Sequence, residues 1–527
     1  MSGFRNVYKN ITDKFVSLRQ YTHQLIFFML FSCIVYFPLM SNRLVNQYDG
    51  LWEYSYYKAG KWELSLGRWF WLYLDRLRFN ISEDPLTSLI TLLCYCIGLV
   101  LILDIFGLQK KKTGYIAGAL FLSNTAVSIS LSYRYMSPTF GMAFLWNVLG
   151  AWLLIKFEKI WYLAVPVSAI CISFGMGCYQ ANIGCACLLF LSFLMYTIAH
   201  DSYSIRQIVK LTAKIAAALF LGALLYILLM KAHLSVFEVD LSSYNGASSY
   251  SILNTVKKLP TSLYNAYFLF GFYYKNQYFK TNLLSGRFVY LIPYVLLALL
   301  MLTEESRLIK KNYLRALLFV LCAGLIPVAC GTVLFIATDT STSLQMTAPW
   351  ALALPVLICL LATFDKLQTM FTAKWLMRLN TVVLLIVLYG CIYQVQVDQN
   401  AMLEGQIATK TIATEILDKL EDDDLLSATK TYCFVGLPAA NPLFTTTDMY
   451  RMANTYAKFG AWWTDPACTR RSYESTFKHL IGVNINICSP DEYRRLLAAE
   501  EVQNMPIFPD EGCITVIDDI VVVRVSQ

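Results

Sequence analysis

The sequence predicts an all-α polytopic membrane protein with a small soluble α/β domain at its C-terminal end. The chain has 527 residues, of which 57% are hydrophobic and 15% are charged. A soluble protein of this size would need more charge to cover its surface. Apolar runs of about 17–22 residues recur along the chain, which is the length that crosses a bilayer. After residue 397 charged residues return, and this change of composition predicts the separate C-terminal domain.

The positions of the charged residues predict an orientation. The net charge is +8, but most Lys and Arg lie in short loops beside apolar runs, a pattern that keeps loops in the cytoplasm and does not indicate nucleic-acid binding. Residues 1–23 are polar and basic, so we expect them to be cytoplasmic. The first apolar run is not followed by a small-residue cleavage site, so the sequence does not indicate a cleavable signal peptide. Loops 175–180 and 339–346 contain no Lys or Arg and are expected outside.

About eleven transmembrane helices follow from these runs, with the N-terminus inside and the C-terminus outside. The expected spans are 25–40, 86–106, 115–131, 139–155, 160–174, 181–199, 211–230, 288–302, 316–337, 348–364 and 381–397. The predicted membrane domain therefore covers residues 24–397. It has two long outer loops, 41–84 and 231–287, and the first of them is expected to contain interfacial helices.

Residues 398–527 are predicted to form an extracytoplasmic α/β domain. An amphipathic helix is expected over 406–420, and the β-branched run 514–525 is typical of a hairpin that turns at Asp518-Asp519. Further apolar runs occur at 432–437 and 481–487. In an oxidising compartment its four cysteines could form disulfides in any of the pairings they allow, or they could remain buried thiols. These cysteines are Cys433, Cys468, Cys488 and Cys513.

The first outer loop is the strongest candidate for a functional site, because acidic, basic, Trp and Tyr side chains gather there between two apolar spans. Aromatic rings of this kind suit both the membrane interface and stacking on sugars. Asp49 is the expected catalytic base, with Glu53 one helical turn further on. Arg68 is expected to neutralise a phosphate. Trp52 and Trp69 are expected to stack on sugar rings or to fix the loop at the interface.

Four polar residues at the outer ends of later spans could complete the site. Arg134 lies between two tyrosines and Arg287 begins the eighth span, and both offer cations for a phosphate. Tyr179 and Gln180 lie in a Gly-rich break between two short spans, where freed backbone groups need protein or water partners. Each candidate also has an ordinary structural explanation as a turn, a helix cap or an interfacial anchor.

Other chemistries lack their motifs. No CxxC pair, HExxH, GxSxG or Walker loop occurs in a context that would support it, and the four histidines are scattered along the chain. We therefore expect neither a metal site nor a cofactor, although a divalent metal stays open. A carboxylate, several cations and neutral hydrogen-bonding groups are instead what the transfer of a sugar from a lipid phosphate requires.

At these residues the sequence resembles the GtrII-type glucosyltransferases of bacterial O-antigen modification, which are polytopic enzymes of the GT-C class. The resemblance extends over essentially the whole chain. Gly50 stands where that family often has a second acidic residue. The residues that carry the resemblance are Tyr48-Asp49 and Trp52, then Gly67-Arg68-Trp69, and more weakly Ser132-Tyr133-Arg134-Tyr135 and Tyr179-Gln180-Ala181.

The resemblance implies a GT-C-like fold and a glucosyl donor, undecaprenyl-phosphate-glucose. The acceptor would be a lipid-linked or surface polysaccharide at the outer face of the bacterial cytoplasmic membrane. We hypothesise that Asp49 deprotonates the acceptor hydroxyl and that arginines stabilise the departing phosphate, with inversion at the anomeric carbon. The expected partners are this donor, the glycan acceptor and membrane lipid, with no nucleic acid. Nothing in the loop distinguishes glucose from mannose, galactose or arabinose.

Two other classes of protein stay open from the sequence alone. A transporter or flippase of lipid-linked saccharide would need ionisable residues at mid-span and broken helices in paired positions. The sequence has few such charges and no evident internal repeat. An assembly partner in envelope polysaccharide export would use the C-terminal domain as its binding module. Release of sugar from a labelled polyprenyl-phosphate donor separates these classes from a transferase.

Overall fold

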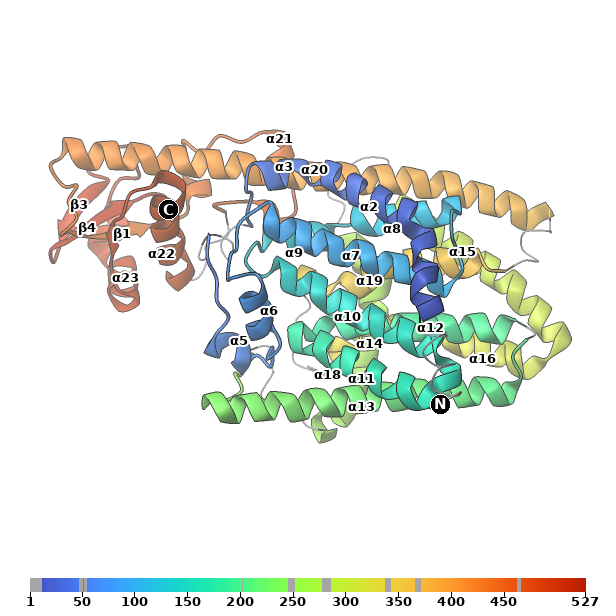
Figure 1. Cartoon of the computed structure of the whole chain (residues 1–527). Helices are drawn as coiled ribbons and strands as arrows, with labels where there is room; N and C mark the ends of the chain where they lie inside the picture. The colour runs from blue at the N-terminus through green and yellow to red at the C-terminus, as the bar shows by residue number, and fades with distance from the viewer. Residues whose placement is uncertain are drawn as a thin grey trace.

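The computed structural model is mainly helical, with one small sheet near the C-terminus. It describes residues 12–46, 51, 55–200, 202–244, 252–276, 286–336, 343–364, 371–461 and 466–527. Within these ranges, the side chains of residues 252–254, 272–276, 286–289, 311, 371 and 466–467 are not described. The helices run alongside one another in an elongated bundle, and the sheet domain lies beyond one end of it (Figure 1).

The first six predicted spans coincide with helices. These helices are α2 (Thr22–Val35) with α3 (Phe37–Ser41), α7 (Leu86–Ile105), α8 (Lys112–Leu122) with α9 (Thr125–Ser132), α10 (Ser137–Lys156), α11 (Trp161–Cys178) and α12 (Ile183–Ala199). The later helices are α13 (Ile205–Phe237), α14 (Ile252–Asn276), α15 (Gly286–Lys311), α16 (Tyr313–Gly324), α17 (Ile326–Cys330), α18 (Val333–Ile336), α19 (Ala348–Leu361) and α20 (Phe371–Asp422).

Length and composition make six of the described helices suitable for crossing a membrane, or up to seven if α8 and α9 form one span bent by 46°. The predicted ninth span is divided among α16, α17 and α18. Pro327 lies in the first turn of α17, where it cannot continue the preceding helix. The number of about eleven spans stays a prediction.

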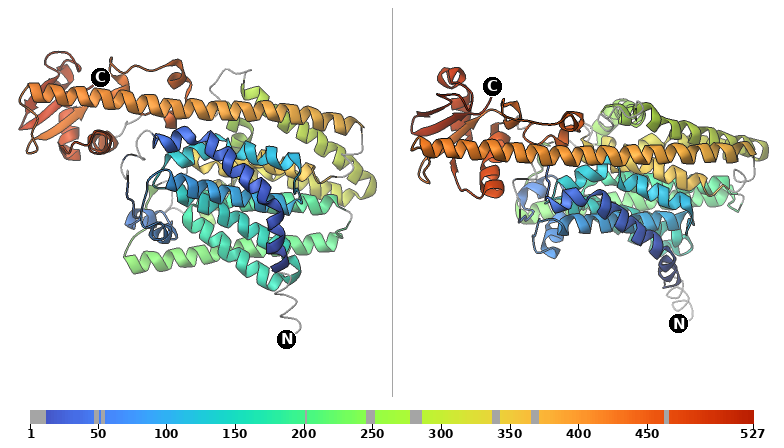
Figure 2. Two further views of the ribbon diagram at one scale, coloured as in Figure 1. Left: turned by 45° about the horizontal axis from the view of Figure 1, so that its top comes forward. Right: turned by 90° about the horizontal axis from the view of Figure 1, so that it is seen from above.

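Two helices extend well beyond the apolar runs that predicted them. The 33-residue α13 begins before the seventh expected span and ends after it. The 52-residue α20 continues without a break past residue 398, where the C-terminal domain was expected to begin. At 1.5 Å per residue α20 is about 78 Å long, whereas the hydrocarbon core of a bilayer is only about 30 Å thick. Accordingly, α20 passes along the bundle and on to the sheet domain (Figure 2).

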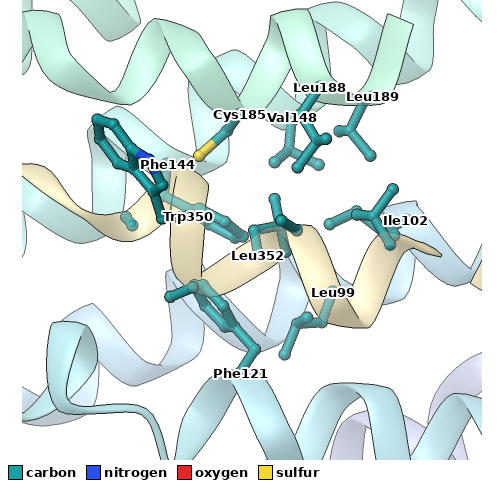
Figure 3. Close-up of a cluster of buried hydrophobic side chains, with 14 of the residues drawn as sticks. Leu99, Ile102, Phe121, Phe144, Val148, Cys185, Leu188, Leu189, Trp350 and Leu352 are labelled. Atoms are coloured by element: carbon teal, nitrogen blue, oxygen red, sulfur yellow. The ribbon is translucent and has the colours of Figure 1, made fainter. Parts of the chain in front are cut away.

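The core of the bundle lies where α7, α8, α10, α12 and α19 meet (Figure 3). Phe121 and Phe144 stack there with ring centroids 5.0 Å apart. A Cβ atom on Gly98 would come within 2.4 Å of the Phe144 ring, so only glycine permits this approach. Small residues at such contacts are typical of membrane helices, whose association depends on close packing. The other labelled residues of this cluster are Leu99, Ile102, Val148, Cys185, Leu188, Leu189, Trp350 and Leu352.

The C-terminal domain contains a four-stranded sheet in the order β2-β1-β4-β3. Its strands are β1 (Thr431–Val435), β2 (Asn486–Ile487), β3 (Ile514–Ile517) and β4 (Ile520–Arg524). β1 is parallel to both neighbours, and β3 and β4 form an antiparallel hairpin. Asp518 and Asp519 turn this hairpin with φ angles of 48° and 63°, which confirms the predicted turn. The predicted amphipathic helix is also confirmed, as the last part of α20.

The bundle and the C-terminal domain are interlocked. Val45 and Leu51 belong to residues 41–84, which were predicted to be an outer loop and are called the first outer segment below; both are buried in the core of the sheet domain. In the other direction, Tyr456 is buried in the core of the bundle. The Tyr456 hydroxyl lies 2.8 Å from Oδ2 of Asp398 in α20 and 2.8 Å from Oγ of Ser128 in α9. The C-terminal domain is therefore bound to the bundle through buried contacts on both sides.

The opposite end of the bundle carries the basic side chains that predicted a cytoplasmic face. Lys156 Nζ lies 2.9 Å from Oδ2 of Asp104, so this aspartate has a lysine partner. Arg315 donates to the carbonyl of His200 just beyond the end of α12 (3.0 Å). Cations at this position stabilise the exposed carbonyls of a helix C-terminus.

Candidate functional site

The first outer segment lies at the same end of the bundle as the sheet domain (Figure 1). Its described part contains α5 (Lys61–Ser65) and α6 (Trp71–Leu77). The predicted residues Asp49, Trp52 and Glu53 lie outside the described residues.

Backbone hydrogen bonds and burial fix the described residues that lie on either side of these positions in the sequence. The amide N of Asn46 donates to the carbonyl of Ser132 at 3.1 Å, and the amide N of Ser82 donates to the carbonyl of Ser55 at 3.0 Å. Leu51 is fully buried. The segment is thus joined to the chain just before α7 and to the end of α9.

A buried ion pair shapes the α6 end of the segment. Asp75 is 1% exposed, and its Oδ1 accepts hydrogen bonds from Nη2 of Arg78 (2.7 Å) and from the indole N–H of Trp71 (3.0 Å). Its Oδ2 accepts from the amide of Ala59 at 2.7 Å. Arg78 also donates to the carbonyl of Tyr135 at 2.6 Å, which joins α6 to the start of α10. Every charge in this group has partners, so its role is structural.

Arg68 has a different environment. Its guanidinium carbon lies 5.0 Å from the ring centroid of Tyr179 and 5.9 Å from that of Trp71. The side chain is half-buried, and its Nε is shielded from solvent without a hydrogen bond to any described residue. Among the described residues no carboxylate oxygen lies within 4.0 Å of this guanidinium. A cation on two aromatic rings with its donors unused is suited to bind an anion, and the planar guanidinium matches a phosphate.

Neighbouring residues hold the turn that presents Arg68. Gly67 has a φ of 77°, and a Cβ atom there would lie 2.5 Å from the hydroxyl of Tyr226. That hydroxyl donates to the carbonyl of Gly67 at 3.2 Å. Gln180 donates from Nε2 to the carbonyl of Leu66 at 2.7 Å and to the Tyr226 hydroxyl at 3.0 Å. Gln180 therefore fixes the backbone immediately before Arg68.

Tyr179 supplies the ring beneath Arg68. It is 2% exposed and lies in the break between α11 and the short 3-10 helix η3 (Gln180–Asn182). Its ring meets that of Phe140 in α10 edge to face, with centroids 4.8 Å apart. Burial raises the pKa of Tyr179 to about 12, although the positive charge of Arg68 opposes this shift. The hydroxyl is therefore neutral at physiological pH.

Trp69 points into the protein. It is 3% exposed and stacks on the ring of His233 in α13, with centroids 5.1 Å apart. A Cβ atom on Gly177 would lie 2.7 Å from the Trp69 ring. This packing favours an anchoring role over sugar stacking, although the sugar-stacking role stays a prediction. The rings of Trp62 (56% exposed) and Tyr244 (54% exposed) lie at the surface with centroids 5.8 Å apart.

Arg134 is completely buried between α9 and α10. The nearby Asp84, 3% exposed, uses Oδ1 to accept hydrogen bonds from the hydroxyls of Ser88 (2.6 Å) and Thr87 (3.0 Å) at the start of α7. Its Oδ2 is buried and accepts no hydrogen bond from the described residues. Burial raises the pKa of Asp84, and the charge of Arg134 opposes this rise.

The C-terminal domain also reaches this region. His479 lies on the π-helix η9 (Thr476–Ile481). Burial lowers the pKa of His479, and the positive charges of Lys478 and Arg134 lower it further. Asp84 and His479 therefore both lie near Arg134, where the bundle meets the C-terminal domain. For the remaining candidate, Arg287, only the helix α15 is described and not the side chain.

Aromatic contacts join the surroundings of the two arginines. Trp71, beneath Arg68, stacks on Tyr135, the neighbour of Arg134, with centroids 6.2 Å apart. The structure thus brings four of the predicted residues, Arg68, Arg134, Tyr179 and Gln180, to one end of the bundle. No group of three or more His, Cys, Asp or Glu side chains that could hold a metal ion occurs in the described part of the chain.

Sequence reasoning missed two members of this region. Asp84 precedes a proline and an apolar run, which in sequence looks like an ordinary helix start. It is distinguished only by its buried Oδ2, which accepts no hydrogen bond from the described residues. His479 carries no local signal, because its position beside Arg134 depends on how the C-terminal domain docks.

Comparisons with known proteins agree with the resemblance seen in the sequence. The family model described as glucosyl transferase GtrII matches residues 47–365, from the first outer segment to just beyond α19. No curated protein and no solved structure gave a match. The matched residues make up more than half of the chain and include Arg68, Arg134, Tyr179 and Gln180. The chain therefore belongs to the GtrII glucosyl transferase family.

Proposed function

We propose that this protein transfers a glucosyl group from a polyprenyl-phosphate carrier to a glycan acceptor at the outer face of the bacterial cytoplasmic membrane. Family membership indicates a glucosyltransferase. The observation that carries the proposal for the donor is Arg68, a half-buried cation at the end of an apolar bundle with no carboxylate partner among the described residues.

A lipid-linked donor places its phosphate at such a position. Its hydrocarbon tail lies along the apolar helices, and its charged head lies at their ends. At a separation of about 4 Å, two unit charges attract by about 1 kcal/mol in water but by about 4 kcal/mol at the effective dielectric constant of about 20 found near protein surfaces. The half-buried Arg68 therefore attracts a phosphate more strongly than a fully hydrated cation would. Arg134 and Arg287 are proposed to assist.

The proposed chemistry is a single displacement. Asp49 takes the proton from the acceptor hydroxyl, and the resulting oxygen attacks the anomeric carbon as the bond from that carbon to the phosphate oxygen breaks. Polyprenyl phosphate leaves, and arginine stabilises the charge that develops on it. One displacement inverts the anomeric configuration. Glu53 is proposed to tune Asp49 or bind the acceptor, and Trp52 to contact the sugar.

The anchoring of the first outer segment supports this assignment. Asn46 is bonded to Ser132, two residues before Arg134, and Ser55 is bonded to Ser82, two residues before Asp84. The described residues that bracket Asp49 in the sequence are thus attached to the region that contains Arg134.

The test is a transfer assay with purified protein and labelled polyprenyl-phosphate-glucose. Asp49→Asn is expected to lower kcat by about 10²–10⁴-fold, as for loss of a general base. Glu83→Gln is the matched control, because Glu83 is another carboxylate of the same segment, in a partly exposed pair with Arg43 at 3.6 Å. Near wild-type transfer by Asp49→Asn would remove Asp49 as the base. A flippase would move the labelled lipid across the bilayer without consuming it.

A further inference from the structure

Two cysteines of the C-terminal domain lie side by side across neighbouring strands. β1 and β2 are parallel, with Thr431 opposite Asn486 and Tyr432 opposite Ile487. The next residue in each chain segment is a cysteine, Cys433 after Tyr432 and Cys488 after Ile487. The amide N of Cys488 donates to the carbonyl of Tyr432 at 2.9 Å, so the pairing continues to the cysteines.

This register suits a disulfide bond. Neighbouring strands lie about 4.8 Å apart, and Cα atoms joined by a disulfide are about 4.4–6.8 Å apart. The interaction between the two thiols raises the pKa of Cys433 and lowers that of Cys488, as expected for thiols that lie close together. Both are buried in one hydrophobic cluster, which also contains Tyr493, Leu496 and Val522. The two cysteines are therefore neighbours on the same face of the sheet.

Strand alternation separates a third cysteine from this pair. Successive side chains of a strand point to opposite faces of the sheet. Tyr432 and Phe434 pack in a second cluster together with Cys513, whereas Cys433 packs in the cluster of Cys488. Cys513 thus lies on the other face of the sheet. Of the pairings that the sequence left open, the structure favours Cys433 with Cys488.

We propose that Cys433 and Cys488 form a disulfide bond in the cell. The inference rests on the outer placement of the C-terminal domain given in the proposed function, because disulfides persist in oxidising compartments. As the domain folds, the two thiols lose two protons and two electrons and form one S–S bond. The electrons pass to the disulfide of a thiol oxidoreductase, which becomes a dithiol.

The bond would fix a weakly held part of the site. β2 contains only two residues and lies at the edge of the sheet. The segment that leads to it carries η9 and His479, beside Arg134. A covalent link from β2 to the central β1 therefore limits the movement of the chain that brings His479 to the domain junction.

The test is to count thiols in the full-length protein purified from membranes without reductant. The sample is denatured and alkylated with N-ethylmaleimide, and its intact mass and peptides are measured. The chain has 15 cysteines. We expect two fewer labels than in a reduced sample, and a linked pair of peptides that contain Cys433 and Cys488. Cys433→Ser is expected to expose Cys488 to labelling, whereas Cys513→Ser, at a matched buried cysteine, is expected to retain the link.

Full labelling of both cysteines, or a link between another pair, overturns the proposal. A bond that forms in isolated membranes treated with diamide, but not in cells, also overturns the proposal. That result would mean that the C-terminal domain does not lie in the oxidising outer compartment. Glucose transfer by the same preparation is measured in parallel. If the disulfide is absent but glucose transfer is intact, only this inference fails. If the disulfide is present but transfer is absent, only the proposed function fails.

Discussion

Two arginines of the first outer segment lie in opposite electrostatic environments. Arg78 is 7% exposed and binds Asp75 and the carbonyls of Ile81 and Tyr135. Arg68 lies on the rings of Tyr179 and Trp71. The first cation is neutralised by the protein, whereas the second finds no carboxylate within the described structure. Burial of charge alone therefore does not indicate a site, because a ligand can bind only where the protein supplies no counter-ion.

The cost of placing each cation in its environment also differs. A buried ion pair contributes little net stability, but removal of one partner leaves an uncompensated charge and is costly. A half-buried cation without a counter-ion has a desolvation cost that its own neighbours only partly offset. An anionic ligand would offset the rest. Mutations at the Asp75–Arg78 pair should therefore affect folding, and mutations around Arg68 should affect donor binding.

Mutation of Asp75 should change the stability of the protein the most. Asp75→Ala removes the partner of a buried Arg78 and should lower the free energy of unfolding by about 3–5 kcal/mol. Thermal unfolding in detergent, followed by tryptophan fluorescence, measures this. Asp448→Ala is the control, because its ion pair with Arg451 is exposed on both sides, and it should leave the unfolding temperature unchanged. An Asp75→Ala protein as stable as wild type would show that the pair is not structural.

The next effect is on transfer at Arg68. Arg68→Gln should lower kcat/KM for the polyprenyl-phosphate donor by about 10²-fold or more, as for loss of a group that stabilises developing charge. The unfolding temperature should stay close to that of wild type. Arg76→Gln, at an exposed arginine on α6 that lies over the Tyr73 ring, is the matched control. Equal losses of kcat/KM in Arg68→Gln and Arg76→Gln would mean that the effect comes from the overall positive charge of the surface and not from Arg68 itself.

A smaller effect is expected from the ring beneath Arg68. Tyr179→Leu removes a cation–π contact worth about 0.5–2 kcal/mol, and it should raise the KM for the donor by about 2- to 30-fold. Tyr179→Phe keeps the ring. Because burial raises the pKa of Tyr179 to about 12, the hydroxyl carries no charge near neutral pH. The pH–rate profile of Tyr179→Phe between pH 6 and 9 should therefore match wild type, and a shifted profile would mean that the hydroxyl itself takes part.

The smallest expected effect is at Gln180. Gln180→Ala removes hydrogen bonds to the Leu66 carbonyl and the Tyr226 hydroxyl. Each neutral hydrogen bond is worth about 0.5–1.5 kcal/mol, so kcat/KM should fall by about 3- to 10-fold. The transfer rate should be lower at every donor concentration tested, because the turn that presents Arg68 is loosened. Donor kinetics as in wild type would show that Arg68 is positioned without this contact.

The fold was predictable where an apolar run and a helix have the same limits. The run 86–106 became α7 (Leu86–Ile105), and the Asp518-Asp519 turn lies where the sequence placed it. The prediction fell short where a helix continues beyond the apolar part, as in α13 and α20, because hydropathy marks only the residues suited to the bilayer. It also fell short at α16–α18, where Pro327 interrupts an apolar run.

The residue types of the site could be predicted from the sequence, but the directions in which the side chains point could not. Gly67-Arg68-Trp69 was singled out in the sequence for its resemblance to the family, and the structure shows why glycine is needed at position 67. Trp69 was expected either to stack on a sugar or to fix the loop, and its ring faces inward because Gly177 leaves space for it. Asp84 and His479 could not be found, since their nearness to Arg134 depends on contacts between distant parts of the chain.

The most direct test of the phosphate site is equilibrium binding of polyprenyl phosphate, the proposed leaving group, to purified protein in lipid nanodiscs. Wild type and Arg76→Gln should bind it with the same Kd. Arg68→Gln should bind it at least about 10-fold more weakly, which corresponds to about 1.4 kcal/mol. Equal Kd values for Arg68→Gln and wild type would contradict the claim that Arg68 holds the phosphate of the donor.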